Sequence, residues 1–207
     1  MPDCVLCGER ILPETAERTG GRCMPCLQRR RVRLNDSQES EYLRIHALLT
    51  ASGWPGDTPH IRTWLDIETE LRRAIQRSSK EVHSALAIGT LTVRDCANTE
   101  EAALTIGRLR RQTTGRFAAQ DIREVCAAQG DFVQFVVGDR KYEIGFNDKC
   151  RDRRSSLLAT VNQALEATGV VQRFIPLPCE KSAWPIAFVT QDSYYKAIAN
   201  GVIPSLN

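Results

Sequence analysis

Apolar residues between positions 34 and 130 recur mostly at helical spacing. Tyr42, Ile45 and Leu49 fall on one face of a first helix. Three later groups of apolar residues also fit helical faces: Ile61, Trp64, Leu65, Leu71, Ile75, Val82 and Leu86; then Ala102, Ile106 and Leu109; then Phe117, Ile122 and Val125. We therefore expect residues 34–130 to be a helical region whose last helix starts near Phe117 and stops at Gly130.

Capping residues mark where two of these helices begin. Asp36 with Glu39 has the spacing of a capping box, in which each side chain accepts a hydrogen bond from the main-chain N–H of the other residue. Asn98 with Glu101 has the same spacing before the stripe at 102–109. Both pairs predict a helix start at that position.

Beyond Gly130 the period changes from helical to alternating. The run at 132–137 and the alternation at 142–146 are typical of two strands, and Gly138 with Asp139 predicts the hairpin turn between them. A helix is expected from about Ser155 to Thr168, then strands over 170–177 and 184–189, then a last helix capped by Thr190. The C-terminal region, 131–207, is thus predicted as a ββαββα arrangement, one sheet with packed helices, in an α+β fold.

Composition narrows the class of protein. With 207 residues and 42% hydrophobic content, the chain can build one substantial core and a small appendage. No run reaches the roughly 18 apolar residues that span a bilayer, and the N-terminus lacks the pattern of a secretory signal. We expect a cytoplasmic protein with no membrane partner. The net charge of +3, carried mostly by Arg, indicates no partner by itself.

Four of the eight cysteines have the spacing of a metal site. Cys4 and Cys7 form one pair separated by two residues, and Cys23 and Cys26 form a second pair fifteen residues later. Two thiolates of such a pair converge on one ion, and the intervening segment is long enough to bring the second pair opposite the first. Disulfides are not expected, because cytosolic thiols stay reduced.

The expected cofactor is one structural Zn²⁺ ion. Four thiolates leave no open coordination position for water or substrate, so the ion does no Lewis-acid chemistry. A head of about 30 residues cannot bury a core of its own, and metal binding supplies its folding free energy. Residues 1–33 are therefore predicted to form a treble-clef or zinc-ribbon head.

A basic run ends the head, with four arginines from Arg29 to Arg33. Such a run suits contacts with phosphates of nucleic acid. No aromatic residue interleaves it as a stacking platform for bases, so a solvated helix face is the favoured interpretation.

Residues able to carry catalysis are sparse. His46, His60 and His83 belong to no metal-ligand or catalytic pattern, and Cys96 and Cys126 are predicted to be small buried apolar side chains. Cys150 stands far from the other cysteines in sequence, and Cys179, in an expected loop, is the thiol with most claim to reactivity. No Gly-rich phosphate loop or nucleophile elbow is present. We expect a protein that is not an enzyme.

Two stretches resemble a known group. Residues 4–26, from Cys-Val-Leu-Cys-Gly-Glu-Arg-Ile to Thr-Gly-Gly-Arg-Cys-Met-Pro-Cys, resemble the zinc-binding head of bacterial immunity proteins of polymorphic-toxin systems. The tail from Arg173 to Ile203 resembles strand–strand–helix endings of the same group. The resemblance implies a stoichiometric inhibitor that neutralises a cognate toxin domain by direct binding.

Aromatic residues beside prolines are the candidate partner-binding positions. Trp54 lies in a predicted loop and Trp184 at a strand start, each next to a proline. Exposed aromatic side chains often dominate interface energies, although both could instead tuck under their own loops. The rival function is a zinc-ribbon regulatory protein that binds nucleic acid through the run at Arg29–Arg33.

Overall fold

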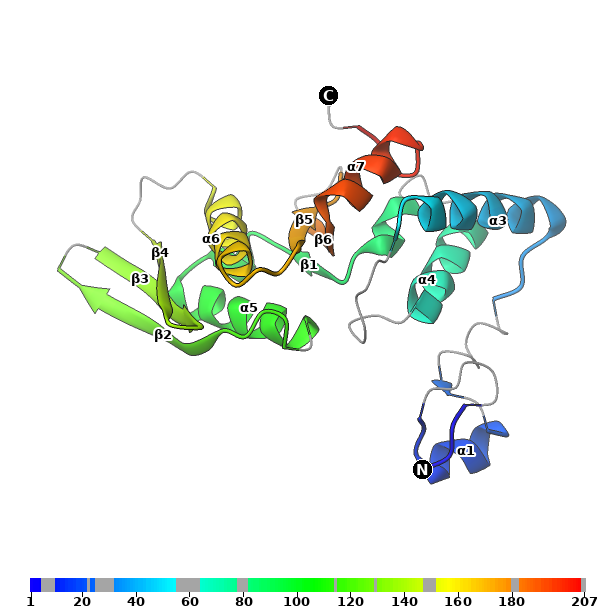
Figure 1. Ribbon diagram of the computed structural model, residues 1–207, viewed down its shortest axis with the longest axis horizontal. Coiled ribbons are helices and arrows are strands. Elements are labelled where there is room, and N and C mark those ends of the chain that lie inside the picture. Colours follow the sequence, from blue (N-terminus) through cyan, green and yellow to red (C-terminus); the bar gives the residue numbers. More distant parts are fainter. Residues whose placement is uncertain are drawn as a thin grey trace.

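The computed structural model describes residues 1–4, 10–21, 23–24, 32–54, 64–77, 82–113, 115–128, 130–146, 152–179 and 183–205. Within these ranges the chain is α+β (Figure 1). The helices are α1 (Pro13–Thr19), α3 (Asp36–Ala51), α4 (Trp64–Gln76), the 3₁₀ turns η1 (Val82–Leu86) and η2 (Arg94–Cys96), α5 (Thr99–Gln112), α6 (Arg153–Ala167) and α7 (Gln191–Ala199). The strands are β1 (Gly89–Leu91), β2 (Gln120–Ala127), β3 (Gly130–Val137), β4 (Arg140–Gly145), β5 (Gln172–Pro176) and β6 (Trp184–Thr190).

The strands form two antiparallel sheets of three strands each, in the orders β1–β6–β5 and β2–β3–β4. Helix α5 packs on β2 and β3, and α6 contacts both β4 and β5, so it links the two sheets (Figure 1). Helix α7 packs on β6, and α3 packs against α4. The predicted ββαββα order of the C-terminal elements is confirmed, but its strands belong to two sheets instead of one.

Strand β6 separates two hydrophobic clusters. Ile186 and Phe188 lie in a first cluster with α5, α6 and the β2–β3–β4 sheet. Ala187 and Val189 lie in a second cluster with α3, α4 and α7. Because successive side chains of a strand point to opposite faces, the β1–β6–β5 sheet is buried on both sides. This explains why its central strand is a continuous apolar run.

Local signals place several helix ends correctly. The side chain of Asn98 accepts from the main-chain N–H of Glu101 at 2.8 Å and starts α5. Thr190 Oγ1 accepts from the N–H of Ser193 at 3.1 Å and starts α7. The first capping box is one residue earlier than predicted, because it is formed by Asn35 and Gln38. The side-chain amides of Asn35 and Gln38 therefore form the capping box, and the carboxylates of Asp36 and Glu39 do not.

The helix expected from Phe117 to Gly130 is wrong, because residues 120–127 form β2. Ile122 and Val125 are three residues apart, which fits a helix. The structure has a register irregularity between Gln120 and Arg123, with Asp121 at a φ of 48°. A bulge of this kind breaks the two-residue period of a strand, so the apolar spacing imitated that of a helix.

The region 34–130 also contains β1, which pairs with β6 from the C-terminal region. The first hydrophobic cluster combines Leu91, Ile106 and Leu109 with Val133 and Phe188. Packing therefore runs across the boundary expected at residue 130. The sequence analysis missed β1 because a three-residue strand carries too little pattern to be recognised in sequence.

Candidate metal centre

The N-terminal segment begins with a short antiparallel pairing. Asp3 and Arg10 form an isolated β-bridge, and the N–H of Ile11 donates to the carbonyl of Pro2 at 2.9 Å. These contacts bring the two ends of the segment 3–10 together. Cys4 lies at the start of that closed segment, as the first cysteine of a metal-binding turn does.

Helix α1 and two glycines then return the chain to Cys4. Pro13 is the first residue of α1, a position where its missing N–H costs nothing. Gly20 and Gly21 have φ angles of 64° and 78°, and the N–H of Gly21 donates to the carbonyl of Ala16 at 2.7 Å. Only glycine adopts two such conformations in succession without strain.

Cys4 and Cys23 are brought together by this path. Their residues are 3% and 7% exposed, and with Ile11 they form a small buried cluster against which Ala16 packs. The main-chain N–H of Cys23 donates to Sγ of Cys4 at 3.2 Å. Two buried thiols on separate segments, one of them accepting an N–H, fit a zinc ligand set.

Cys7 and Cys26, the other two predicted ligands, lie outside the described residues. Among the residues that the structure describes, no group of three or more His, Cys, Asp or Glu side chains converges as for a metal. Of the four predicted zinc ligands, the structure therefore describes Cys4 and Cys23. Of the basic run, Arg29–Arg31 also lie outside the description, while Arg33 is exposed.

The two tryptophans that are candidate partner-binding residues have different surroundings. Trp54, in the loop predicted there, is 4% exposed and belongs to the second hydrophobic cluster, so its ring is buried, which is one of the two alternatives that the sequence left open. The main-chain N–H of Trp54 donates to the carbonyl of Leu49 at 2.9 Å, so the chain folds back at the end of α3 and carries the ring inward. Trp184 is partly buried beside the first cluster, and the guanidinium of Arg154 lies 3.9 Å from its ring centroid.

Two of the three histidines have polar contacts within the fold. His83 is buried and its Nε2–H donates to the carbonyl of Pro178 at 2.6 Å. His46 lies on α3 with its Nε2 3.7 Å from Oε1 of Glu68, which also accepts from the hydroxyl of Tyr42 at 2.8 Å. Both histidines join separate segments of the fold. His60 lies outside the described residues.

The remaining cysteines differ in exposure. Cys96 is buried, as predicted, and burial together with the nearby Asp95 raises the pKa of its thiol to about 11. Cys126 is exposed on β2, contrary to the expected burial, because the segment is a strand and not a helix. Cys179 is of intermediate exposure, and Cys150 lies outside the described residues.

Cys96 is therefore expected to resist alkylation in the folded protein. A thiol with a pKa near 11 is almost wholly protonated at pH 8, and the thiolate is the reactive form. Mass spectrometry after iodoacetamide treatment should find Cys126 modified and Cys96 unmodified until denaturant is added. Modification of Cys96 at the rate of Cys126 under native conditions would contradict the packing described above.

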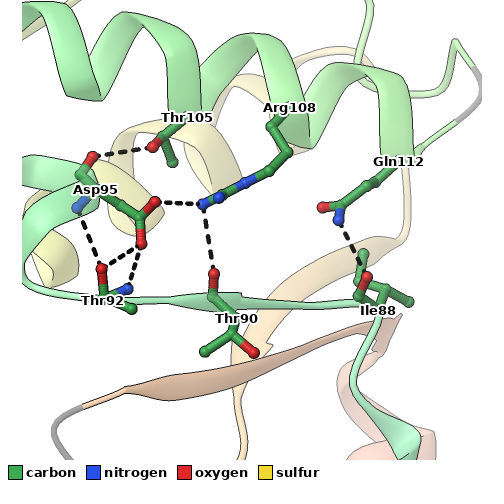
Figure 2. A network of polar contacts seen from close by, with 7 residues as sticks. All are labelled: Ile88, Thr90, Thr92, Asp95, Thr105, Arg108 and Gln112. Atoms are coloured by element: carbon green, nitrogen blue, oxygen red, sulfur yellow. Dashed lines mark hydrogen bonds and ion pairs between the residues drawn. The ribbon is translucent and has the colours of Figure 1, made fainter.

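A cluster of polar side chains surrounds Asp95 (Figure 2). Its carboxylate accepts from the N–H of Thr92 at 2.5 Å, from the Thr92 hydroxyl at 2.6 Å and from Arg108 at 2.9 Å. The hydroxyl of Thr105 donates to the main-chain carbonyl of Asp95 at 2.9 Å. These contacts tie β1 and η2 to α5. The sequence interpretation missed them, although a threonine three residues before an aspartate is a recognisable turn signal.

Replacing Asp95 with asparagine is expected to cost about 1–3 kcal/mol of unfolding free energy at pH 7. Burial alone raises the pKa of Asp95, but hydrogen bonds from Thr92 and then the charge of Arg108 outweigh it, so the pKa lies below its ordinary 3.8. A lowered pKa contributes stability above the ordinary value that is lost as pH falls through the folded value. Urea unfolding between pH 7 and pH 3 should show the difference between the two proteins shrinking below about pH 4.

The matched control is Asp139→Asn, in the exposed hairpin turn between β3 and β4. Its effect on the free energy of unfolding should stay within about 0.5 kcal/mol at every pH, as for surface positions in general. Equal losses in both variants would show that the Asp95 cluster adds nothing beyond surface charge.

Comparison of the chain with known protein families, with characterised proteins and with solved structures finds no match. The resemblance to immunity proteins therefore depends on the residues quoted for it alone. Among the described helices, none has the length and apolar content needed to cross a bilayer.

Proposed function

We propose that this protein binds another protein without catalysis, and that its N-terminal head is held by one structural Zn²⁺ ion. Cys4, Cys7, Cys23 and Cys26 would be the ligands. The observation that carries the zinc assignment is the buried contact between the Cys23 N–H and Cys4 Sγ. A zinc ion bound by four thiolates supplies folding free energy and leaves no position for substrate.

The surroundings of other reactive side chains support a non-catalytic role. His83 is engaged with the carbonyl of Pro178, and His46 lies beside Glu68 and Tyr42. The raised pKa of Cys96 makes it a poor nucleophile. Contacts within the fold therefore explain the position of each of these side chains.

The partner that we propose is a cognate toxin domain, which the protein would neutralise by covering its active site or fixing its conformation. The resemblance of residues 4–26 and of the tail to immunity proteins supports this choice. Tyr195 on α7 is 61% exposed and is an aromatic side chain open to a partner. Aromatic residues of this kind are enriched among those that dominate interface energies.

Co-expression with the product of the neighbouring gene tests the proposal. A stable one-to-one complex and rescue of growth by this protein are the expected results. Tyr195→Ala should weaken the complex, whereas Val171→Ala, at an equally exposed residue, should not. A neighbouring gene that is harmless without this protein, together with no complex, would overturn the toxin assignment.

Nucleic-acid binding through the run at Arg29–Arg33 is the alternative outcome. Its signature is an affinity for nucleic acid that falls steeply as salt rises, because phosphate contacts release counterions. Loss of that affinity on replacing Arg33, which is exposed, would favour the regulatory function over the inhibitor.

A further inference from the structure

The two sheets have four outer edges, and three of them are protected. A free edge presents unpaired N–H and C=O groups that can pair with another chain. At the edge of β1, two side chains from α5 supply donors. Gln112 Nε2 donates to the carbonyl of Ile88 at 3.1 Å, and Arg108 Nη2 donates to that of Thr90 at 3.4 Å (Figure 2).

The edges of β5 and β2 are protected by other means. The amide of Asn162 on α6 donates to the carbonyl of Phe174 at 2.9 Å and accepts from its N–H at 2.8 Å, so it occupies the edge of β5. The edge of β2 carries the irregularity between Gln120 and Arg123. Bulges of this kind twist an edge away from regular pairing.

At the edge of β4, Lys141 and Glu143 place charges that pair with each other at 2.8 Å, but among the described residues no side chain hydrogen-bonds to its outward main-chain groups and its pairing has no register irregularity. The N–H of Phe146 donates to the carbonyl of Asp131 at 2.8 Å, which fixes the alternation of the β3–β4 pairing. Arg140, Tyr142 and Ile144 direct their main-chain groups toward β3, so Lys141, Glu143 and Gly145 direct theirs outward. The outward groups of β4 are therefore free to pair with an additional strand.

A cavity of about 440 Å³ lies beside this edge, between β4 and α6. Its lining comes from consecutive residues of the strand and from positions on one flank of the helix: Arg140, Lys141, Tyr142, Glu143, Thr160, Gln163 and Ala167. Asn162, which protects the edge of β5, occupies a different side of α6. Helix α6 thus closes one edge and forms the wall of a groove along the other.

Tyr142 in this cavity has an unsatisfied hydroxyl. The residue is 7% exposed, its ring stacks on that of Phe135 with centroids 5.4 Å apart, and its hydroxyl is buried with no hydrogen-bond partner among the described residues. Buried polar groups are nearly always paired. The exposed side chain of Arg140, on the same face of β4, makes no ion pair or hydrogen bond within the described part of the chain. Both residues are donors that lack an acceptor.

We propose that the edge of β4 and the flank of α6 bind an extended, acidic peptide segment of a partner protein as a fourth strand of the β2–β3–β4 sheet. This inference rests on the proposed function, since it names the surface with which a protein partner would be held. Main-chain pairing with Lys141, Glu143 and Gly145 supplies affinity, and an acidic side chain toward Arg140 and Tyr142 supplies specificity.

A second copy of the chain is the competing occupant. Antiparallel pairing of two β4 strands about Tyr142 would set Lys141 opposite Glu143 of the other copy. The same pairing would set each Arg140 opposite Ile144, and no carboxylate would reach the guanidinium. The donors that lack an acceptor therefore favour an acidic peptide over self-association.

Random decapeptides displayed on phage and panned against the full chain test this proposal. Enriched peptides should alternate β-branched residues with polar ones and contain Asp or Glu. Fluorescence anisotropy should show binding at least about tenfold weaker for Glu143→Pro, because proline removes an outward N–H without breaking the β3 pairing. The matched control Glu143→Thr keeps that N–H and should bind within about twofold of the parent.

Two further variants separate specificity from folding. Tyr142→Phe should fold as the parent does, since the hydroxyl has no partner to lose, yet it should bind acidic peptides several-fold more weakly. Arg140→Ala should bind more weakly and lose the preference for Asp and Glu. Enrichment of no peptide, or equal binding by Glu143→Pro and the parent, would overturn the proposal. A dimer in light scattering that Glu143→Pro converts to monomer would assign the edge to a second copy.

The proposal and the proposed function fail in different ways. If Glu143→Pro still forms the toxin complex, the inhibitor function is supported and the proposed peptide binding at β4 is contradicted. If peptides bind at β4 but the protein forms no complex with a neighbouring gene product, the peptide site is supported and the toxin assignment is contradicted.

Discussion

Replacing Cys23 with serine is expected to release zinc and unfold residues 1–33, while residues 131–207 keep their structure. The parent protein, purified without chelator, should contain one zinc ion per chain by elemental analysis. Structural zinc contributes about 10–16 kcal/mol to the folding of small zinc domains, and a serine hydroxyl is a poor substitute for a thiolate. Among the described residues of the head, the buried cluster consists of Cys4, Ile11 and Cys23, with Ala16 beside it, and segments of this size rarely fold without a metal or disulfide.

The matched control is Cys126→Ser, on the exposed face of β2. It removes one thiol but should leave both the zinc content and the backbone chemical shifts of the head unchanged. A parent protein without zinc would sink the ligand assignment. Full zinc content in Cys23→Ser would remove Cys23 from the ligand set.

Replacing Phe117 with alanine is expected to cost about 3–5 kcal/mol, as for other fully buried aromatic residues. The ring centroid of Phe117 lies 5.8 Å from that of Phe135 on β3 and 6.2 Å from that of Phe174 on β5, both in edge-to-face contact. Phe117 is fully buried between the two sheets. Its loss would open a cavity at the place where the sheets meet.

Urea denaturation measures this effect, with Leu104→Ala on α5 as the control. Leu104 is 61% exposed, so its truncation should change the free energy of unfolding by no more than about 0.5 kcal/mol. A loss below about 1 kcal/mol for Phe117→Ala would mean that the two sheets do not share one core.

Short-range signals in the sequence determined much of the fold. Asn98, Thr190 and the Gly138–Asp139 turn act on residues two to four positions away, and each forms the predicted cap or turn. Gly20 and Gly21 also act locally, since their positive φ angles turn the chain toward Cys23. These features depend on local backbone geometry, which the residue types fix on their own.

Tertiary structure decided what local pattern leaves open. Strand β1 is three residues long and exists because β6 pairs with it, and β2 imitated a helix because a bulge shifted its apolar residues. The tryptophan at position 54 entered the core because the chain turns back after α3. The groove beside β4 and the unsatisfied hydroxyl of Tyr142 arise from the placement of α6 against a strand edge. Strand pairing and helix placement join residues far apart in the chain, so the sequence determined most helices and the β3–β4 hairpin, whereas long-range packing determined β1, β2 and the partners of each element.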